Sequence, residues 1–364
     1  MTAQTTSAKD STTQFSWPAH GLRGIAAFGV FVGHITGGLR LHIYPDQPDF
    51  ARFAEHVTNL GTFGVELFFV ISGFVICASV ARYSATEFFA RRLVRIYPLF
   101  FFFTALYFAG NLILDIDPEK RSFDLLLRNL TFIDLFGPER PNQGGLSPNA
   151  WSISFEIWFY CFMGLAATCL RRQHRIALVI TGLGFLMFVW RFPIALYFCI
   201  GVFCYWLRKR EVRLGRNLRW IELVALLGIV AVATAQHFDY TRPEMMSLTP
   251  FVLMILTGIF FYSVTETGSY LGSILSSRAL TFMGTISFSF YLVHPYSYYV
   301  LRFLLGKIGL YSLPAAVAMP VFYTTMTIVA IATSYVVHIV LERGPYQVIF
   351  RSNVYHKPQS TLAP

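Results

Sequence analysis

LRGIAAFGVFVGH, residues 22–34, is an apolar run with Arg23 near one end and His34 at the other. A second apolar run, GVELFFVISGF at residues 64–74, carries Glu66. An ionisable side chain inside a membrane helix costs free energy, so it usually faces a protein interior or a wet cavity and marks function. The two runs therefore predict a membrane protein with a buried reactive site.

The composition of the chain predicts many membrane-spanning helices. Of its 364 residues, 55% are hydrophobic and only 13% are charged, whereas soluble domains carry about 25% charged residues. One spanning helix needs about 20 mostly apolar residues. We therefore expect an all-α, polytopic membrane protein with about ten transmembrane helices. The stretches are 20–39, 59–81, 94–115, 149–170, 176–190, 192–207, 219–236, 248–266, 280–304 and 313–340.

The distribution of positive charge predicts that both termini are cytoplasmic. With the N-terminus inside, eighteen Lys and Arg residues fall in inner segments and ten in outer ones, as the positive-inside rule requires. The net charge of +10 then reflects topology, and we expect no nucleic-acid partner. The predicted organisation is a disordered cytoplasmic tail at 1–16, a transmembrane domain at 17–345 and a cytoplasmic tail at 346–364.

Four ionisable residues are predicted to lie at one depth in the membrane. A helix rises about 1.5 Å per residue, and alternating helices place His34, Glu66, Glu156 and His294 at a similar level in the outer half of a core about 30 Å thick. On the first helix Arg23 and His34 are eleven residues apart, which leaves them about 20° from eclipsed on one face.

These residues also have structural interpretations. Membrane His and Glu side chains often serve as interhelical hydrogen-bonding struts, and Arg91, Arg92 and Arg95 could be topology anchors alone. Ser72 lies in Ile71–Ser72–Gly73 and lacks the Gly-x-Ser-x-Gly pattern of a nucleophile elbow. A transporter could use buried His and Glu residues as a proton relay, but no matched pair of broken helices is visible. The five cysteines fit no zinc or redox spacing.

Five motifs in series resemble acyltransferase family 3, the bacterial multi-pass proteins that O-acylate surface glycans and some small molecules. They are GLRGIAA…H at 21–34, GVELFFVISGF at 64–74, RRLVRIYP at 91–98, WSISFE at 151–156 and ISFSFYLVHP at 286–295. The ending ERGP at 342–345 matches only loosely. The resemblance spans nearly the whole chain and implies ten spans with a cytoplasmic acyl-CoA donor.

The resemblance also implies residue roles. His34, paired with Arg23, would be the catalytic histidine. Arg92 and Arg95 match a signature linked to acyl-CoA binding. Trp151 and Glu156 match the motif of the fourth helix.

From these observations we hypothesise transfer of an acyl group, expected to be acetyl, from acyl-CoA to a hydroxyl of a cell-surface or exported glycan. His34 would act as general base or as transient acyl carrier. Glu66 or Glu156 would orient its imidazole, and Arg23, Arg92 and Arg95 would bind the donor. Trp151, Ser72 and His294 are further site candidates.

The remaining expectations concern partners and location. We expect no metal, a location in the bacterial cytoplasmic (inner) membrane among membrane lipids, and a glycan or lipid-linked sugar as acceptor. A homo-oligomer is left open. The alternatives are a cytoplasm-facing O-acyltransferase of a small molecule or lipid-linked sugar, and a proton-coupled transporter.

Overall fold

The computed structural model describes residues 15–114, 117–137, 146–147, 149–215, 218–236 and 240–352. In these ranges every regular element is helical, which confirms the all-α fold class. The helices are α1 (Trp17–His42), α2 (Pro48–Arg82), α3 (Ala85–Leu114), α4 (Phe123–Leu130), α5 (Ala150–Arg171), α6 (Arg175–Arg191), α7 (Leu196–Lys209), α8 (Leu218–Ala235), α9 (Arg242–Met245), α10 (Leu248–Val264), α11 (Tyr270–Leu275), α12 (Arg278–Lys307), α13 (Ala315–Val337) and α14 (Gly344–Phe350). Short 3₁₀ turns and one π-helical segment, η7 (His338–Arg343), connect or extend them.

Six helices in the described residues are long and apolar enough to cross a membrane, which confirms a multi-pass membrane protein. They are α1, α2, α3, α5, α8 and the continuous helix that runs from α13 to α14. Each of the ten predicted stretches coincides with a helix, but ten spans and the sidedness of the termini stay predictions. Helix α12 has 30 residues and is absent from the six, because polar residues such as Ser289 and His294 lower its mean hydropathy.

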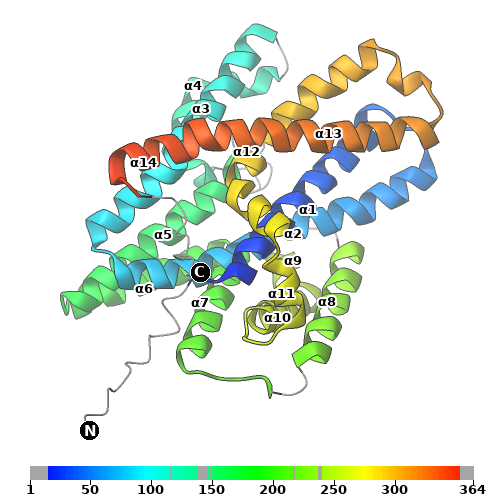
Figure 1. The fold of residues 1–364 in the computed structure, drawn as a ribbon. Coiled ribbons are helices and arrows are strands. Elements are labelled where there is room, and N and C mark those ends of the chain that lie inside the picture. The colour runs from blue at the N-terminus through cyan, green and yellow to red at the C-terminus, as the bar shows by residue number, and fades with distance from the viewer. Residues whose placement is uncertain are drawn as a thin grey trace, which may run out of the picture.

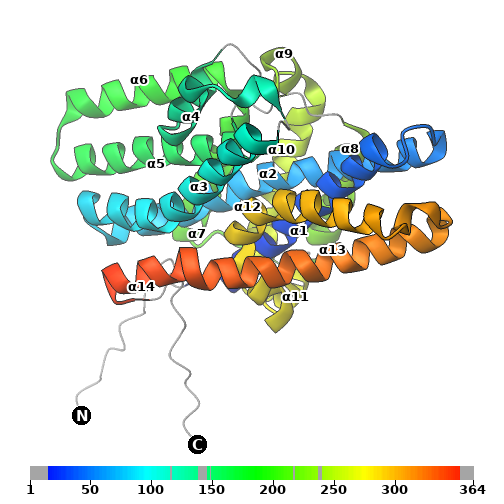
Figure 2. The ribbon, with the colours of Figure 1, turned by 90° about the horizontal axis from the view of Figure 1, so that it is seen from above.

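The helices lie largely side by side. Figure 2 shows α5 and α6 as a hairpin along one edge, the α13–α14 rod along the opposite edge, and α2, α1 and α12 between them. Figure 1 shows the same rod crossing the front of the molecule in orange and red. The central helices α1, α2 and α12 carry most of the predicted site residues.

Glycines let α1 pack closely against both central neighbours. Ser16 caps the N-terminus of α1 by accepting a hydrogen bond from the Ala19 amide at 3.4 Å. A Cβ placed on Gly61 of α2 would lie 2.7 Å from the Gly33 Cα. A Cβ on Gly24 would lie 2.7 Å from the Gly284 nitrogen on α12. Small residues at helix crossings allow such close backbone contact in membranes, so α1 is fixed between α2 and α12.

Aromatic stacking joins α2, α5 and α7 into one wall. The ring of Phe198 on α7 stacks on Phe69 of α2 and on Phe159 of α5, with both pairs of ring centroids 4.3 Å apart. Offset-stacked rings add about 0.5–1.5 kcal/mol per pair beyond the buried area. This wall holds α2 and α5 at a fixed separation.

A proline fixes α5 against α12. Pro295 lies inside α12 and has no backbone N–H, so the carbonyl of Tyr291 loses its helical partner. The side-chain amide of Asn149, at the N-cap of α5, donates to that carbonyl. A buried carbonyl needs a partner, so this bond stabilises the contact between the two helices.

The C-terminal helix is longer than predicted. The helix that begins at Ala315 continues to Phe350, so the predicted boundary after residue 345 falls inside it. The π-helical segment η7 inserts a wider turn into this rod, and such turns are frequent at functional sites. Nearly all of the predicted N-terminal tail, and the chain from residue 353 onward, lie outside the described residues.

Candidate active site

His34 and His294 form a hydrogen-bonded pair between α1 and α12, which we call the histidine pair. The His34 Nδ1 atom lies 2.8 Å from the His294 Nε2 atom. The other ring nitrogen of His294, Nδ1, lies 2.9 Å from the carbonyl oxygen of Phe290. His294 is fully buried, whereas the His34 side chain is exposed. The structure therefore brings together two of the four residues that were predicted to share one depth.

The predicted carboxylate partner of His34 is not found. Within the described part of the chain, no Asp or Glu side chain hydrogen-bonds to His34, and His294 takes that place. Glu66 is fully buried on another face of α2, the face on which Phe69 packs against α7. Its carboxylate lies beside the hydroxyl of Tyr240. Counting residues gives the depth of a side chain in the membrane but not the direction in which it points around its helix. Glu66 and His34 therefore share a predicted depth but point in different directions.

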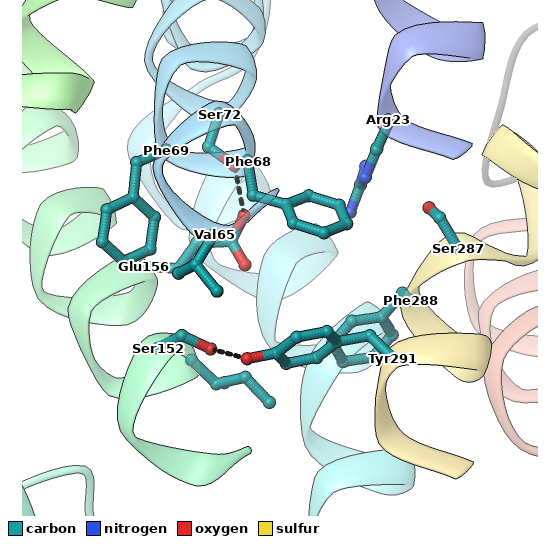
Figure 3. Close-up of a pocket in the computed structure, with 11 residues that line it drawn as sticks. Arg23, Val65, Phe68, Phe69, Ser72, Ser152, Glu156, Ser287, Phe288 and Tyr291 are labelled. Atoms are coloured by element: carbon teal, nitrogen blue, oxygen red, sulfur yellow. Dashed lines mark hydrogen bonds between the residues drawn. The ribbon is translucent and has the colours of Figure 1, made fainter. Parts of the chain in front are cut away.

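A cleft opens between α1, α2, α5 and α12, with about 420 Å³ of empty space that includes open solvent. We call it the Arg23 cleft, and Figure 3 shows its polar side chains converging from these four helices. Buried apolar space with a few convergent polar groups is the usual form of a small-molecule site. The lining residues are Arg23, Val65, Phe68, Phe69, Ser72, Ser152, Ile153, Glu156, Ser287, Phe288 and Tyr291.

Glu156 is held on one side of the Arg23 cleft. Ser72 donates a hydrogen bond to its Oε1 atom at 2.7 Å, and Tyr160 donates to the same oxygen. Figure 3 shows the bond from Ser72 across the α2–α5 boundary. Ser72 therefore acts as a hydrogen-bond donor to a carboxylate. Its hydroxyl has no contact with a histidine base among the residues that the structure describes.

Arg23 points from α1 into the cleft (Figure 3). In the described ranges no hydrogen bond or ion pair engages its guanidinium. The side chain is partly buried. An unpaired cation in a partly buried place is costly unless a ligand or water accepts its hydrogen bonds. Arg23 is therefore the residue of this site best suited to bind an anionic or strongly polar ligand.

The cleft and the histidine pair lie on one continuous face. Ser287, Tyr291 and His294 follow the spacing of one helical face on α12. The Tyr291 ring contacts Phe68 at a centroid distance of 5.8 Å and His294 at 6.2 Å. Its hydroxyl forms a hydrogen bond of 2.7 Å with Ser152. Tyr291 thus lies between Arg23 and the histidine pair.

Two of the three arginines predicted to bind acyl-CoA, Arg92 and Arg95, already have partners in the structure. Arg92 donates to the Ser79 hydroxyl at 2.6 Å and lies 5.0 Å from the centroid of the Tyr160 ring. The Arg95 Nε atom lies 3.6 Å from a carboxylate oxygen of Glu342, and the Arg95 side chain is buried. Arg92 stays partly accessible, so the two positions differ.

Glu342 is the centre of a second buried polar group, which we call the Glu342 cluster. Its Oε2 atom accepts hydrogen bonds from Ser289 at 2.9 Å and from His338 at 2.8 Å, while Oε1 faces Arg95. The π-helical segment carries both His338 and Glu342. The cluster joins α3, α12 and the C-terminal rod.

Trp151 lies outside the lining of the cleft. Its ring contacts the Tyr240 ring at a centroid distance of 5.4 Å and the Phe155 ring at 6.1 Å. No group of three or more His, Cys, Asp or Glu side chains that could hold a metal ion exists in the described ranges.

Several cleft residues were missed by the sequence analysis. Ser287 and Tyr291 lie seven and three residues before His294, inside a motif already noted, so helical spacing alone could have identified them. Ser152 follows Trp151 directly and could have been found in the same way. Phe68 gave no signal, because aromatic residues are common throughout this chain.

The chain is similar to known acyltransferases. The model of a family described as an acyltransferase domain matches residues 19–339. An acyltransferase, MdmB from Streptomyces mycarofaciens, is 33% identical over 145 residues, which cover 38% of this chain and only 36% of MdmB. The exopolysaccharide production protein ExoZ from Rhizobium meliloti is 26% identical over 268 residues, 68% of this chain and 80% of ExoZ. No solved structure matches the chain.

Proposed function

The chain belongs to the acyltransferase family whose model covers residues 19–339, and from this premise we propose that it transfers an acyl group from acyl-CoA to a hydroxyl of an exported or surface glycan. The observation that carries the proposal is the exposed His34 imidazole on the same helical face as the unpaired Arg23. One group offers a base, and the other offers a charge that could anchor a donor.

The distance between the two residues suits a long, flexible donor. Eleven residues separate Arg23 from His34 by about 16 Å along α1, a length of the same order as an extended pantetheine arm. The serine hydroxyls of the cleft could hydrogen-bond the amides of that arm, and Phe68 and Phe288 could pack against it. The thioester would then lie near Tyr291 and the histidine pair.

The proposed chemistry is direct acyl transfer with His34 as general base. The His34 imidazole takes the proton of the acceptor hydroxyl as its oxygen attacks the thioester carbonyl carbon. The carbon–sulfur bond then breaks, and the departing thiolate of CoA takes the proton from the imidazolium. The products are an ester and CoA thiol, and His34 returns to its neutral form.

The arginines receive different roles in the proposal. Arg92, which is partly accessible, keeps its predicted role as a phosphate ligand at the donor entrance. Arg95 is proposed to stabilise the structure around that entrance and not to contact the donor, because its guanidinium is buried against Glu342. The acceptor is proposed to be a glycan because ExoZ is named for exopolysaccharide production. Acetyl is proposed as the acyl group, and the inner membrane as the location.

The test uses the purified full-length protein with acetyl-CoA labelled in the acetyl group. We expect label to leave CoA and enter a surface-glycan fraction only when both are present, and we expect His34→Gln to abolish this transfer. His42→Gln is the matched control, since His42 is an exposed histidine at the end of the same helix. Equal transfer by wild type and His34→Gln would overturn the role of His34. Transfer to a cytosolic small molecule but to no glycan would overturn the proposed acceptor.

A further inference from the structure

The hydrogen bonds of the histidine pair determine which ring nitrogen carries each proton. A backbone carbonyl can only accept a hydrogen bond. The carbonyl of Phe290 lies 2.9 Å from the Nδ1 atom of His294, so that nitrogen carries the proton. Neutral imidazole has a single N–H, which leaves His294 Nε2 with a lone pair.

The same reasoning extends from His294 to His34. Two lone pairs cannot share a hydrogen bond, so the His34 Nδ1 atom, 2.8 Å from His294 Nε2, must supply the proton. His34 Nε2 is then unprotonated. This is the state that a general base needs at the atom that receives the substrate proton.

The surroundings of His294 keep its ring neutral. The side chain is fully buried and contacts the rings of Phe31, Phe290 and Tyr291. His34 and Tyr291 are the titratable groups that contact it, and no carboxylate does so among the described residues. A charge buried in such a place without a counter-ion costs several kcal/mol. Neutral His294 therefore accepts the hydrogen bond from His34 Nδ1, a role that a carboxylate plays beside the catalytic histidine of many hydrolases.

The backbone of α12 fixes the position of this acceptor. Pro295 follows His294 directly, and Asn149 occupies the carbonyl of Tyr291 that the proline leaves free. The glycine contact between α1 and α12 sets the distance between the two helices. The His294 ring is therefore held by its own helix turn, and α1 brings His34 to it.

We propose that His294 is a positioning residue that holds His34 in the Nδ1–H tautomer and so directs its Nε2 lone pair toward the acceptor hydroxyl. Which nitrogen of a histidine is protonated follows from the hydrogen bond that the other nitrogen makes. The consequence for catalysis rests on the proposed function. The tautomer itself does not, because it follows from the hydrogen bonds alone.

The first test measures the tautomer directly. The full-length protein, labelled with ¹⁵N-histidine and held in lipid nanodiscs, is compared with its His294→Gln and His294→Phe variants, and the His34 signals are assigned by their loss in His34→Gln. We expect a neutral Nδ1–H form of His34 in the wild type and in His294→Gln, whose amide oxygen can still accept. We expect the Nε2–H form to appear in His294→Phe. An Nε2–H form in the wild type would overturn the proposal.

The second test measures transfer by the same proteins. We expect His294→Phe to lower kcat by up to about 10⁴-fold, the loss seen when a catalytic histidine is left in the wrong tautomer, and His294→Gln to stay within about tenfold of wild type. KM for acetyl-CoA should change little in either variant. A merely structural role predicts equal losses for both variants, and that result would overturn the proposal. If no protein shows transfer, the NMR result still decides the tautomer, and only the proposed function fails.

Discussion

The histidine pair and the Glu342 cluster both lie along α12, but their polar atoms are used differently. Ser289 of the cluster and His294 of the pair are five residues apart on one helix. In the cluster, Glu342 accepts from two side chains and faces Arg95, and all four side chains are buried. In the pair, His34 keeps one ring nitrogen free and its side chain is exposed.

This difference separates structural from reactive polar groups. A buried group whose hydrogen bonds are satisfied inside the protein has no capacity left for a ligand. A group with an unused polar atom retains that capacity. Arg23 lines the cleft without a partner among the described residues, and the His34 side chain is exposed. We therefore expect substitutions at Arg23 or in the histidine pair to change transfer activity, and substitutions in the Glu342 cluster to change the stability of the fold.

The largest expected effect is the loss of transfer in His34→Gln. Removing a general base costs about 10²- to 10⁴-fold in rate. The melting temperature in detergent should stay near that of wild type, because the His34 side chain is exposed. Rates from labelled acetyl-CoA and a thermal melt measured together check this. A large drop in the melting temperature of His34→Gln would show that His34 serves mainly to stabilise the fold.

The next largest effect is destabilisation by Glu342→Gln. This change leaves Arg95 buried without its counter-ion, and breaking a buried ion pair costs about 3–5 kcal/mol in the free energy of unfolding. Thermal melts in detergent measure it. Glu87→Gln is the matched control, since its carboxylate pairs with Arg91 at 2.8 Å near the surface, where such a pair contributes about 0.3–0.5 kcal/mol. Equal shifts for the two variants would contradict the comparison.

An intermediate effect is expected for Arg23→Gln. A hydrogen bond to a charged group contributes about 1.5–3 kcal/mol, so KM for acyl-CoA should rise by about ten- to hundredfold. The melting temperature should not fall, because Arg23 has no protein partner in the described residues. Arg40→Gln, at the exposed end of the same helix, is the control. An unchanged KM would remove Arg23 from the donor site.

The smallest expected effect concerns Asp134, a buried carboxyl between α4 and α5. Burial raises its pKa from 3.8 to about 6, so the folded state holds its proton more tightly than the unfolded state does. Stability should therefore fall by about 1 kcal/mol as the pH rises from about 5 to 7.

Asp134→Asn should remove this part of the pH dependence. The amide oxygen can keep the hydrogen bond from Ser154, now 2.6 Å long. Asn129, which now donates to Asp134 at 3.2 Å, can accept from the new amide if its own side-chain amide flips. Melting temperatures of both proteins at the two pH values measure the effect. An equal change in melting temperature between the two pH values for wild type and variant would show that Asp134 does not titrate in this range.

The sequence correctly predicted that Arg23 and His34 share one face of α1, but it did not predict which side chains contact that face. Eleven residues between Arg23 and His34 place both on one side of α1 whatever the neighbours are, and Arg23 on that face lines the cleft. Glu66 was placed at the depth of His34 by counting residues. The depth of a residue does not say in which direction its side chain points around the helix axis. Because Phe69 packs on α7, Glu66 on the same side of α2 points away from His34.

The Glu342 cluster shows a second limit of the sequence. A regular helix is the natural prediction for an apolar run such as 313–340. The π-helical turn at 338–343 changes the helical phase, and only the packing of the rod against α3 and α12 reveals that His338, Glu342 and Arg95 meet.

The sequence by itself determined a multi-pass helical membrane protein, its family motifs and the alignment of Arg23 with His34, because hydropathy and helical periodicity are local properties of the chain. Only the tertiary structure decided that His34 pairs with His294, that Glu66 faces another way and that Arg95 is held by Glu342. These contacts depend on the rotation of each helix about its own axis. That rotation is set by glycine crossings, a proline and aromatic stacking between segments far apart in the chain.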